Sequence, residues 1–264
     1  MVQDTTPTLG PQLIAHRGYP HHYPENTLLA IRKAIEAGAR FVEVDVQMSA
    51  DYVPVLHHDA NLKRTTGRDR LLMDLTLEHL RQLDCSETDR LGPSFRGLSI
   101  PTLHEFVRLV KAEPGLIAFV EIKRASLKRF GSQTVVNRVM DQLPLPTDQF
   151  VIISFDRAVI ELLKDNFEAK TGWVIEAFDD EHREQAERLS PDFVFCNQRF
   201  LPDDSSSLWA GPWRWAIYCT QEAERAIELG CRGAHFVETN AIGEMLEHPL
   251  LMVHSAVCAE GKDA

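Results

Sequence analysis

The sequence predicts an α/β fold, a (β/α)8 TIM barrel formed by a single domain over residues 1–264. Short apolar runs alternate with helical patterns along the chain, which is typical of βα units around a parallel sheet. No internal repeat, low-complexity segment or Gly/Ser linker divides the chain into smaller units. The length of 264 residues also fits one α/β barrel, which typically has about 250 residues.

Apolar runs with the length and composition of strands recur along the chain. They are Gln12–His16, Phe41–Gln47, Val53–His58, Leu116–Lys123, Phe150–Phe155, Thr171–Ala177, Asp192–Asn197, Arg214–Cys219 and Gly233–Thr239. Only residues 48–52 separate the second run from the third, whereas a parallel crossover needs a dozen or more residues. We therefore expect these two runs to form a hairpin, which leaves eight parallel strands for the barrel.

Capping residues predict where several helices begin and end. Asn26 can cap a helix that Gly38 ends, because asparagine favours the N-cap and glycine the position after the last turn. Residues 102–105 form a capping box for a later helix. Thr220 is expected to begin a further helix that ends at Gly230.

The longest segment without a barrel strand runs from about residue 59 to residue 100. It contains one short helical pattern, Thr76–Leu83, and a polar stretch, Ser86–Arg96. A connection of this length in a compact domain is usually functional. We expect a small cap insertion over the barrel mouth, directly after the strand hairpin.

Composition limits the partners and the compartment. Lys and Arg number 28 against 39 Asp and Glu, so the formal net charge is −11, and a nucleic-acid partner is not expected. No stretch approaches the ~20 apolar residues of a membrane span, and residues 1–12 lack the features of a leader, so integral membrane association is not expected. The cysteines include no CxxC pair and indicate reduced thiols in a soluble cytoplasmic protein. They are Cys85, Cys196, Cys219, Cys231 and Cys258.

Polar side chains are expected to converge at the carboxyl ends of three neighbouring barrel strands. Because residues of a strand alternate between its faces, Glu43 and Asp45 share the face opposite the valines of their strand. The same spacing pairs Glu121 with Lys123, and His16 ends the first strand. The valine face suits the helix layer, so the charged face points into the barrel. Active sites of such barrels lie at these strand ends.

Three inward carboxylates in a low-dielectric site repel one another unless a cation neutralises them. All-oxygen ligands favour a hard ion, so Glu43, Asp45 and Glu121 predict one divalent metal ion, Mg²⁺ or Ca²⁺. With that ion and with Arg17 and Lys123 beside it, the site carries one net positive charge. This charge matches a phosphodiester better than a phosphomonoester dianion.

Histidines are the candidates for proton transfer, namely His16 and one of the hairpin residues His57 and His58, which the pattern alone does not separate. Cleaving a P–O bond needs a base and an acid, and histidine can serve as either, each role being worth ~10²–10⁴-fold in rate. Taken singly, these residues have simpler explanations. An inward histidine is commonly structural, and Glu121 with Lys123 can form a plain ion pair. Convergence at one end of the barrel is the argument for function.

Ordered motifs extend these candidates along the chain. They are Ala15-His16-Arg17-Gly18, Pro24-Glu25-Asn26-Thr27-Leu28, Glu43-Val44-Asp45-Val46, Val53-Pro54-Val55-Leu56-His57-His58-Asp59, Arg64-Thr65-Thr66-Gly67, Asp74-Leu75-Thr76-Leu77, Ile100-Pro101-Thr102-Leu103, Glu121-Ile122-Lys123 and Ser154-Phe155. With these motifs the chain resembles the glycerophosphodiester phosphodiesterase family, a group of phospholipase C-like barrels. The resemblance covers most of the chain and is strong from about residue 13 to residue 123.

The resemblance implies a role for each candidate residue and favours His58 over His57. The implied roles are acid–base catalysis for His16 and His58, metal ligation for Glu43, Asp45 and Glu121, and phosphate contact for Arg17 and Lys123. It further implies that the substrate's own glycerol 2-hydroxyl attacks phosphorus and that water opens the resulting cyclic phosphate.

The C-terminal third departs from the family pattern. The family usually has Trp-Thr-Val-Asn where this chain has Trp215-Ala216-Ile217-Tyr218. Its usual Ile-Thr-Asp-Arg-Pro is replaced by Phe236-Val237-Glu238-Thr239-Asn240. Both segments lie at strand ends, where they are expected to touch the alcohol or glycerol portion of the substrate. The changes around Tyr218 and Glu238 therefore affect substrate preference and not phosphoryl chemistry.

The resulting hypothesis is metal-dependent hydrolysis of a small-molecule glycerophosphodiester to glycerol 3-phosphate and an alcohol. A lysophospholipase D or phospholipase C-like activity on a lipid is one alternative, although residues 86–96 are mostly polar. A non-catalytic phosphodiester-binding protein is another, although no histidine or carboxylate of the set is missing. The head-group alcohol, the preferred metal and the oligomeric state do not follow from the sequence.

Overall fold

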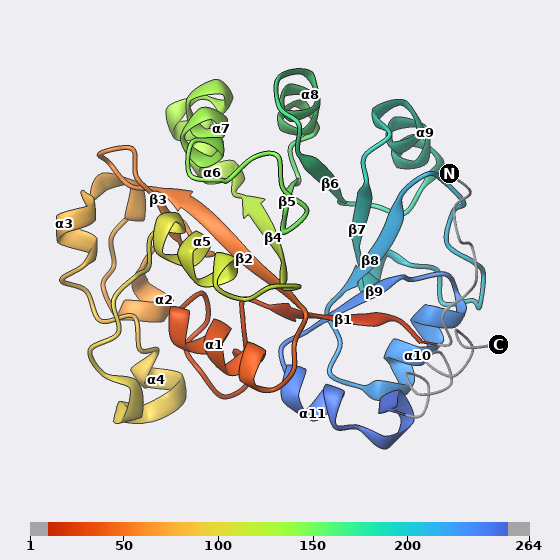
Figure 1. Ribbon diagram of the computed structural model, residues 1–264, viewed down its shortest axis with the longest axis horizontal. Helices are drawn as coiled ribbons and strands as arrows, with labels where there is room; N and C mark the ends of the chain where they lie inside the picture. Colours follow the sequence, from red (N-terminus) through yellow and green to blue (C-terminus); the bar gives the residue numbers. More distant parts are fainter. Residues whose placement is uncertain (1–9, 253–264) are drawn as a thin grey trace.

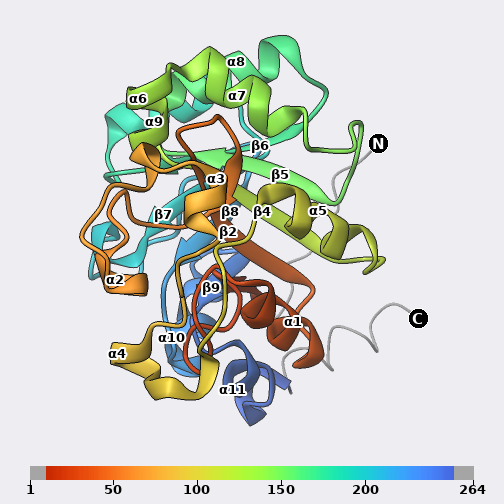
Figure 2. The ribbon, with the colours of Figure 1, turned by 90° about the vertical axis from the view of Figure 1, so that its left-hand side faces the viewer.

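The computed structural model describes residues 10–252, which form a closed parallel barrel with helices around it (Figures 1 and 2). The barrel strands are β1 Gln12–His16, β2 Phe41–Met48, β4 Ile117–Ile122, β5 Phe150–Ser154, β6 Lys170–Ile175, β7 Phe193–Asn197, β8 Arg214–Tyr218 and β9 Phe236–Thr239. Each is parallel to its neighbours, and β1 pairs with both β9 and β2, which closes the circle. The predicted fold class is confirmed. Cys258 and residues 1–9, which make up most of the N-terminal segment considered above for a leader, lie outside the described residues.

The predicted hairpin is also confirmed. Strand β3, Pro54–Leu56, runs antiparallel to β2, with Val46 opposite Leu56 and Met48 opposite Pro54. The His57 amide then donates to the Asp45 carbonyl at 3.0 Å, so the returning chain stays beside β2 as far as the carboxylates. A segment that leaves the barrel therefore comes back to its mouth within a few residues.

Helices cover the outside of the barrel. They are α1 Leu28–Glu36, α5 Leu103–Lys111, α6 Arg124–Phe130, α7 Ser132–Met140, α8 Arg157–Asn166, α9 Asp180–Leu189, α10 Ala223–Cys231 and α11 Ile242–Leu246. Figures 1 and 2 show α6 to α9 on one side of the barrel and α1, α10 and α11 on the other. In α5, Phe106, Val107 and Val110 are buried at helical spacing, so this helix packs through one apolar face. No helix within residues 10–252 is long and apolar enough to cross a bilayer.

Phenylalanines fill the inside of the barrel below the polar site. Phe41, Phe119 and Phe236 are in contact, with ring centroids 5.0 Å apart for Phe41 and Phe236 and 6.0 Å apart for Phe119 and Phe236. Each of these residues is followed two positions later by a glutamate. Because strand residues alternate faces, each glutamate points into the barrel on the same side of its strand as the phenylalanine and lies nearer to the carboxyl end.

The structure corrects three of the predicted helix boundaries. Thr27, not Asn26, caps α1, with its hydroxyl accepting from the Ala30 amide at 3.1 Å. The N-cap of α10 is Glu222, two residues after the predicted Thr220. Gly230 lies inside that helix, and its lack of a side chain permits close packing, since a Cβ would lie 2.7 Å from Pro11. The capping box at 102–105 is confirmed.

The segment between the hairpin and α5 has more helical structure than expected. It contains α2 Lys63–Thr66, η1 Leu72–Asp74, α3 Leu77–Leu80, α4 Thr88–Leu91 and η2 Gly92–Phe95. Leu62, Leu72 and Leu80 form part of a small apolar cluster of its own. Arg64 and Arg90 tie the segment to the loop after β1, through Glu25 Oε1 at 2.7 Å and through the Pro20 carbonyl. It therefore packs beside the barrel mouth.

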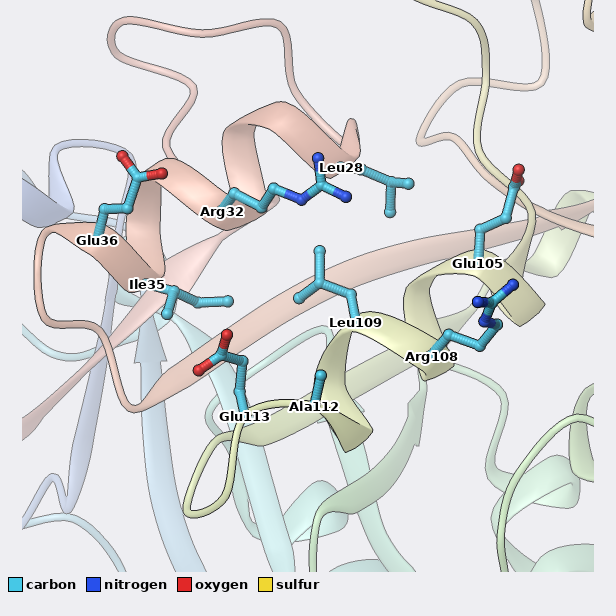
Figure 3. Close-up of a pocket in the computed structure, with 9 residues that line it drawn as sticks. All are labelled: Leu28, Arg32, Ile35, Glu36, Glu105, Arg108, Leu109, Ala112 and Glu113. Atoms are coloured by element: carbon cyan, nitrogen blue, oxygen red, sulfur yellow. The ribbon is translucent and has the colours of Figure 1, made fainter.

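A groove of about 550 Å³ lies in the helix layer between α1 and α5 (Figure 3). Leu28, Ile35 and Leu109 line it, with charged side chains such as Arg32 and Glu113 around them. None of the predicted site residues lines this groove. It is a seam between two neighbouring helices and not the mouth of the barrel.

Gly18 combines a positive φ with a close approach to the backbone of a helix. Its φ is +89°, and a Cβ there would lie 2.8 Å from Ala30 C and Ile31 N of α1. We expect Gly18→Ala to lower the free energy of unfolding by about 2–4 kcal/mol, from backbone strain plus overpacking. Gly67 has a φ of +72° and open space around it, so Gly67→Ala should cost about 1–2 kcal/mol. Urea denaturation measures both, and equal losses would contradict the packing argument.

Candidate active site

The predicted site residues meet in one pocket at the carboxyl ends of the barrel strands. This pocket has a volume of about 320 Å³. Its lining residues are His16, Arg17, Glu43, His58, Glu121, Lys123, Ile153, Phe155, Val174, Phe195, Asn197, Tyr218, Cys219 and Glu238. Of the predicted set, only Asp45 is absent from the lining, because it lies beneath the surface at 1% exposure. The α1–α5 groove is larger but brings no such set of titratable groups together.

Three carboxylates form the centre of the site. Glu43, Asp45 and Glu121 each offer an oxygen, and these oxygens lie within 4.8 Å of one another. Asp45 and Glu121 are register partners on β2 and β4, so the sheet itself sets their spacing. Cation–oxygen distances of about 2.1 Å for Mg²⁺ and about 2.4 Å for Ca²⁺ are compatible with this spread. These three residues could therefore hold a metal ion.

Charge crowding in this cluster favours a bound cation. Burial raises the pKa of Glu43 well above its usual value, and the charges of Asp45 and Glu238 raise it further. Burial likewise raises the pKa of Glu121, although Lys123 opposes the shift. Glu43 Oε1 is buried and has no hydrogen-bond partner within residues 10–252. An unpaired carboxylate oxygen aimed into an acidic cluster suits metal ligation.

Asp45 is the best-supported member of the trio, and Asn26 supports it. The Asn26 carboxamide donates to Asp45 Oδ2 at 2.8 Å and accepts from the Asp45 amide at 3.0 Å. Asn26 has a φ of +54°, which turns its side chain towards β2 and away from the helix that it was predicted to cap. Although burial opposes the shift, Lys123 and Arg17 lower the pKa of Asp45, so this carboxylate is ionised.

Lys123 and Arg17, the predicted phosphate contacts, line the pocket and are paired with carboxylates. Lys123 Nζ lies 2.7 Å from Glu121 Oε1 and 3.1 Å from Asp45 Oδ1. Arg17 Nε lies 3.0 Å from Asp45 Oδ2, and its Nη1 lies 3.1 Å from Glu25 Oε1. Both cations thus offset part of the acidic charge while remaining at the pocket surface.

The two predicted catalytic histidines both line the pocket and are each oriented through Nδ1. His16 Nδ1 lies 2.8 Å from Asn240 Oδ1, and its Nε2 lies 3.8 Å from Glu43 Oε2. Burial, followed by the charge of Arg17, lowers the pKa of His16 to about 4, so its imidazole is neutral at pH 7. His58 Nδ1 lies 2.6 Å from Asp59 Oδ1. Both rings are thus held by a hydrogen bond at one nitrogen.

His57 has a different environment from His58. It is 3% exposed, and its two ring nitrogens lie 2.8 Å from the Asp59 carbonyl and from the Thr65 hydroxyl. It does not line the pocket. His57 therefore supports the turn that presents His58, which explains why adjacent histidines occur at the end of this hairpin.

Glu238 is the site residue that sequence reasoning did not assign. The sequence placed it in a strand-end segment expected to touch the alcohol or glycerol portion of the substrate but gave it no role of its own, and it lines the pocket at 2% exposure. Burial raises its pKa to about 8, and the charges of Glu121 and Asp45 contribute to the shift. The signal was present in the sequence, because Phe236 and Glu238 repeat the spacing of Phe41 and Glu43 on another strand.

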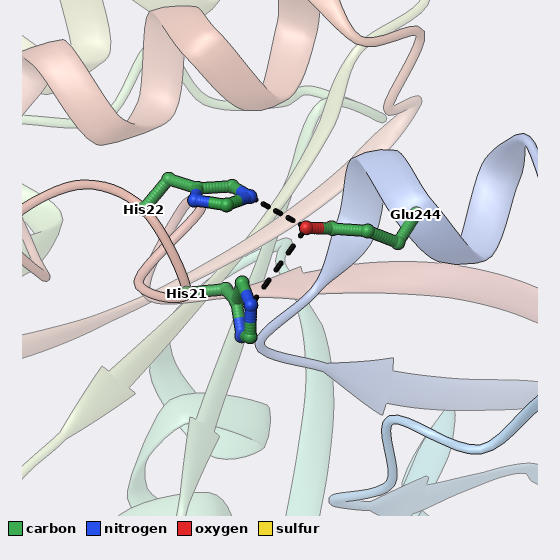
Figure 4. A group of neighbouring side chains, drawn as sticks. All are labelled: His21, His22 and Glu244. Carbon is green, nitrogen blue, oxygen red and sulfur yellow. Dashed lines mark hydrogen bonds and ion pairs between the residues drawn. The ribbon is translucent and has the colours of Figure 1, made fainter.

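A second cluster of possible metal-binding side chains lies on the surface and has a simpler explanation. His21, His22 and Glu244 approach one another beside α11 (Figure 4). His22 Nε2 lies only 2.6 Å from Glu244 Oε1, whereas two ligands of one tetrahedral metal, each about 2.0 Å from it, lie more than 3 Å apart. The Tyr19 hydroxyl also donates to Glu244 Oε2 at 2.6 Å. These contacts are hydrogen bonds that tie the loop after β1 to α11.

Comparison with known proteins identifies relatives of the chain. The model of the glycerophosphoryl diester phosphodiesterase family matches residues 16–188. Glycerophosphodiester phosphodiesterase 1 of Bos taurus is 38% identical over 147 residues, which cover 56% of this chain and 43% of that protein. A glycerophosphodiester phosphodiesterase of Caldanaerobacter subterraneus is 39% identical over 111 residues, 42% of this chain and 44% of that protein. The match thus spans less than half of these relatives' length.

Solved structures match over a larger share of the chain. An Oleispira antarctica phosphodiesterase, in complex with the product sn-glycerol-3-phosphate, has a TM-score of 0.78 and 27% identity, covering 89% of this chain and 95% of its own. A glycerophosphodiester phosphodiesterase of Thermotoga maritima has a TM-score of 0.68 and 26% identity, covering 90% and 97%. The described barrel therefore corresponds to nearly the whole of each of these chains.

Replacing each hairpin histidine by alanine should show which of the two stabilises the fold. We expect His57→Ala to lower the free energy of unfolding by about 2–4 kcal/mol, because it leaves a small cavity and unpairs the Thr65 hydroxyl. His58 is 33% exposed, so His58→Ala should change stability by less than about 1 kcal/mol. Urea denaturation at pH 7 gives both values. The opposite order would contradict the assignment of His57 as structural.

Proposed function

Because the chain belongs to the glycerophosphoryl diester phosphodiesterase family, we propose that it hydrolyses glycerophosphodiesters to glycerol 3-phosphate and an alcohol. One observation carries this proposal. Two imidazoles line a single pocket, and beside them lie three carboxylate oxygens that are within 4.8 Å of one another. The related Oleispira antarctica phosphodiesterase binds sn-glycerol-3-phosphate as its product, which supports the proposed product.

Glu43, Asp45 and Glu121 hold one divalent cation, Mg²⁺ or Ca²⁺, in this proposal. Such an ion, when bound, polarises the phosphoryl oxygens and offsets the charge that develops on them. The unpaired Glu43 Oε1 and the raised pKa values of Glu43 and Glu121 support the ligand set. Arg17 and Lys123, both at the pocket surface, contact the phosphate oxygens.

His16 and His58 transfer the protons. Neutral His16 donates Nδ1–H to Asn240, so its Nε2 can accept the proton of the attacking glycerol 2-hydroxyl. His58, oriented by the Asp59 carboxylate, donates a proton to the oxygen of the leaving alcohol. The new P–O bond closes a cyclic phosphate as the bond to the alcohol breaks. Water then opens the ring, with the two histidines exchanging roles, and releases glycerol 3-phosphate.

The organisation around the site is part of the same proposal. The chain, described over residues 10–252, forms a single domain in which the insertion at about residues 59–100 acts as a cap. The ion pairs of Arg64 with Glu25 and Asp59 support this, because Asp59 also orients His58. The four cysteines within the described residues are free thiols, which supports a reducing compartment such as the cytoplasm.

Turnover of glycerophosphocholine and glycerophosphoethanolamine tests the proposed function. We expect release of glycerol 3-phosphate with Mg²⁺, Ca²⁺ or Mn²⁺ and a loss of activity on chelation. His16→Ala and His58→Ala should each lower kcat by ~10²–10⁴-fold, and Glu43→Gln should weaken metal binding measured by calorimetry. Asp69→Asn is the control, because this exposed carboxylate pairs only with insertion residues such as Lys63. Full activity in excess chelator would exclude the metal role.

A direct comparison of substrates separates this function from activity on lipids. The large apolar side chains that are exposed near the insertion are few, namely Tyr52 and Leu71. We therefore expect kcat/KM for glycerophosphocholine to exceed that for lysophosphatidylcholine by at least about tenfold, since one acyl chain would lack an apolar surface to bury it. A preference for the acylated substrate would support the lipid alternative. Binding of glycerophosphodiesters with metal but without turnover would support a non-catalytic role.

A further inference from the structure

The chemistry proposed above uses only one half of the pocket. The ends of β7, β8 and β9 supply the other half, with Asn197, Tyr218, Cys219 and Glu238. Asn197 and Tyr218 are register partners on neighbouring strands, so the sheet places them side by side. None of these residues has a part in metal binding or proton transfer as proposed.

Glu238 is the unusual member of this half. It is 2% exposed, and its Oε1 has no hydrogen-bond partner within the described part of the chain. Ile153, Val174 and Phe195 also line the pocket and make its wall apolar. Leaving a buried polar atom unpaired is unfavourable, and more so for a charged group. A pocket-lining atom of this kind points to a partner that the ligand supplies.

We propose that Glu238 recognises a hydroxyl group of the substrate and makes the β7–β9 half of the pocket a hydroxyl-binding subsite. A hydroxyl can both donate and accept, so it can pair with Glu238 and with the neighbouring polar side chains Tyr218 and Asn197. The hydroxyl belongs either to the terminal carbon of the glycerol unit or to a polyol head group. This inference rests on the proposed function for the identity of the substrate.

Glu238 lies in the C-terminal segment that departs from the family pattern described above. The segment Phe236–Asn240 replaces the usual Ile-Thr-Asp-Arg-Pro of the family, and it places a carboxyl group two residues after Phe236. A site built to pair a substrate hydroxyl discriminates strongly against an analogue that lacks it, because the polar group of the protein is then left unpaired. Glu238 thereby acts on substrate choice and leaves the phosphoryl transfer to the other half of the pocket.

Calorimetric binding tests the subsite without requiring turnover. The probes are glycerol 3-phosphate and 1,2-propanediol phosphate with its phosphate on the primary oxygen, which lacks only the terminal hydroxyl. If the glycerol unit supplies the hydroxyl, wild type should bind the first at least about tenfold more tightly, and Glu238→Met should reduce that ratio to near one. Glu238→Gln, which keeps hydrogen-bonding atoms, should retain part of it. Glu176→Met is the matched control, because Glu176 lies at the end of β6 outside this pocket and is paired with Arg124.

Kinetics then locate the hydroxyl. If Glu238→Met abolishes discrimination against the 3-deoxy analogue of the glycerol unit, the glycerol supplies it. If Glu238→Met abolishes a preference for glycerophosphoglycerol over glycerophosphocholine, the head group supplies the hydroxyl. Failure of the proposed function would appear as no turnover by any variant, while the binding ratios would still report on Glu238.

Stability and metal affinity complete the test. Glu238→Met removes a buried unpaired carboxyl, so we expect the Tm to rise by about 2–4 °C, and Glu238→Gln provides the second variant if Met disturbs folding. Unchanged binding ratios together with an unchanged head-group preference in both variants would overturn the proposal. So would a loss of Mg²⁺ affinity in Glu238→Gln as large as that in Glu43→Gln, because Glu238 would then be a metal ligand.

Discussion

Mutual repulsion among buried carboxyl groups is the constraint on which the rest of this site depends. Glu43, Asp45, Glu121 and Glu238 occupy one end of a barrel whose interior below them is filled with phenylalanine. Burial raises the pKa of three of them, and only Asp45 has its pKa lowered, by Lys123 and Arg17. Lys123 and Arg17 offset part of the negative charge, and Asn26 donates a hydrogen bond to Asp45.

The crowded carboxyl groups stand on barrel strands, so the sheet itself brings them together and no special loop conformation is needed. A repeated pattern of a phenylalanine followed two residues later by a glutamate occurs on β2, β4 and β9, and the closed parallel sheet brings the three glutamates to one pocket. The phenylalanines lie towards the inside of the barrel, and the glutamates line the pocket at its mouth. The same alternation that places valine against the outer helices thus produces a low-dielectric acidic centre.

Loops from distant parts of the chain hold the groups that act on this centre. Asn26 of the first βα loop fixes Asp45, Asn240 after the last strand orients His16, and Asp59 after the hairpin orients His58. The first loop is itself held on both sides, by Arg64 of the insertion and by Glu244 of α11. The orientation of both histidines therefore depends on contacts between loops at the beginning and at the end of the chain's barrel.

Strand periodicity and connection length are local properties, so the barrel, the hairpin and the set of residues that meet at its mouth could be predicted from the order of residues alone. The sequence also contained the repeated spacing that places Glu238 with the other carboxyl groups, although that spacing was not recognised as a signal. Only the tertiary structure decided which neighbour each polar group acquires. It gave Thr27 the cap of α1 and Asn26 the support of Asp45, buried His57 while exposing His58, and paired Lys123 with two carboxylates. The physical reason is that hydrogen bonds and charge effects depend on distances between strands and loops far apart in the chain, and local pattern carries no information on those distances.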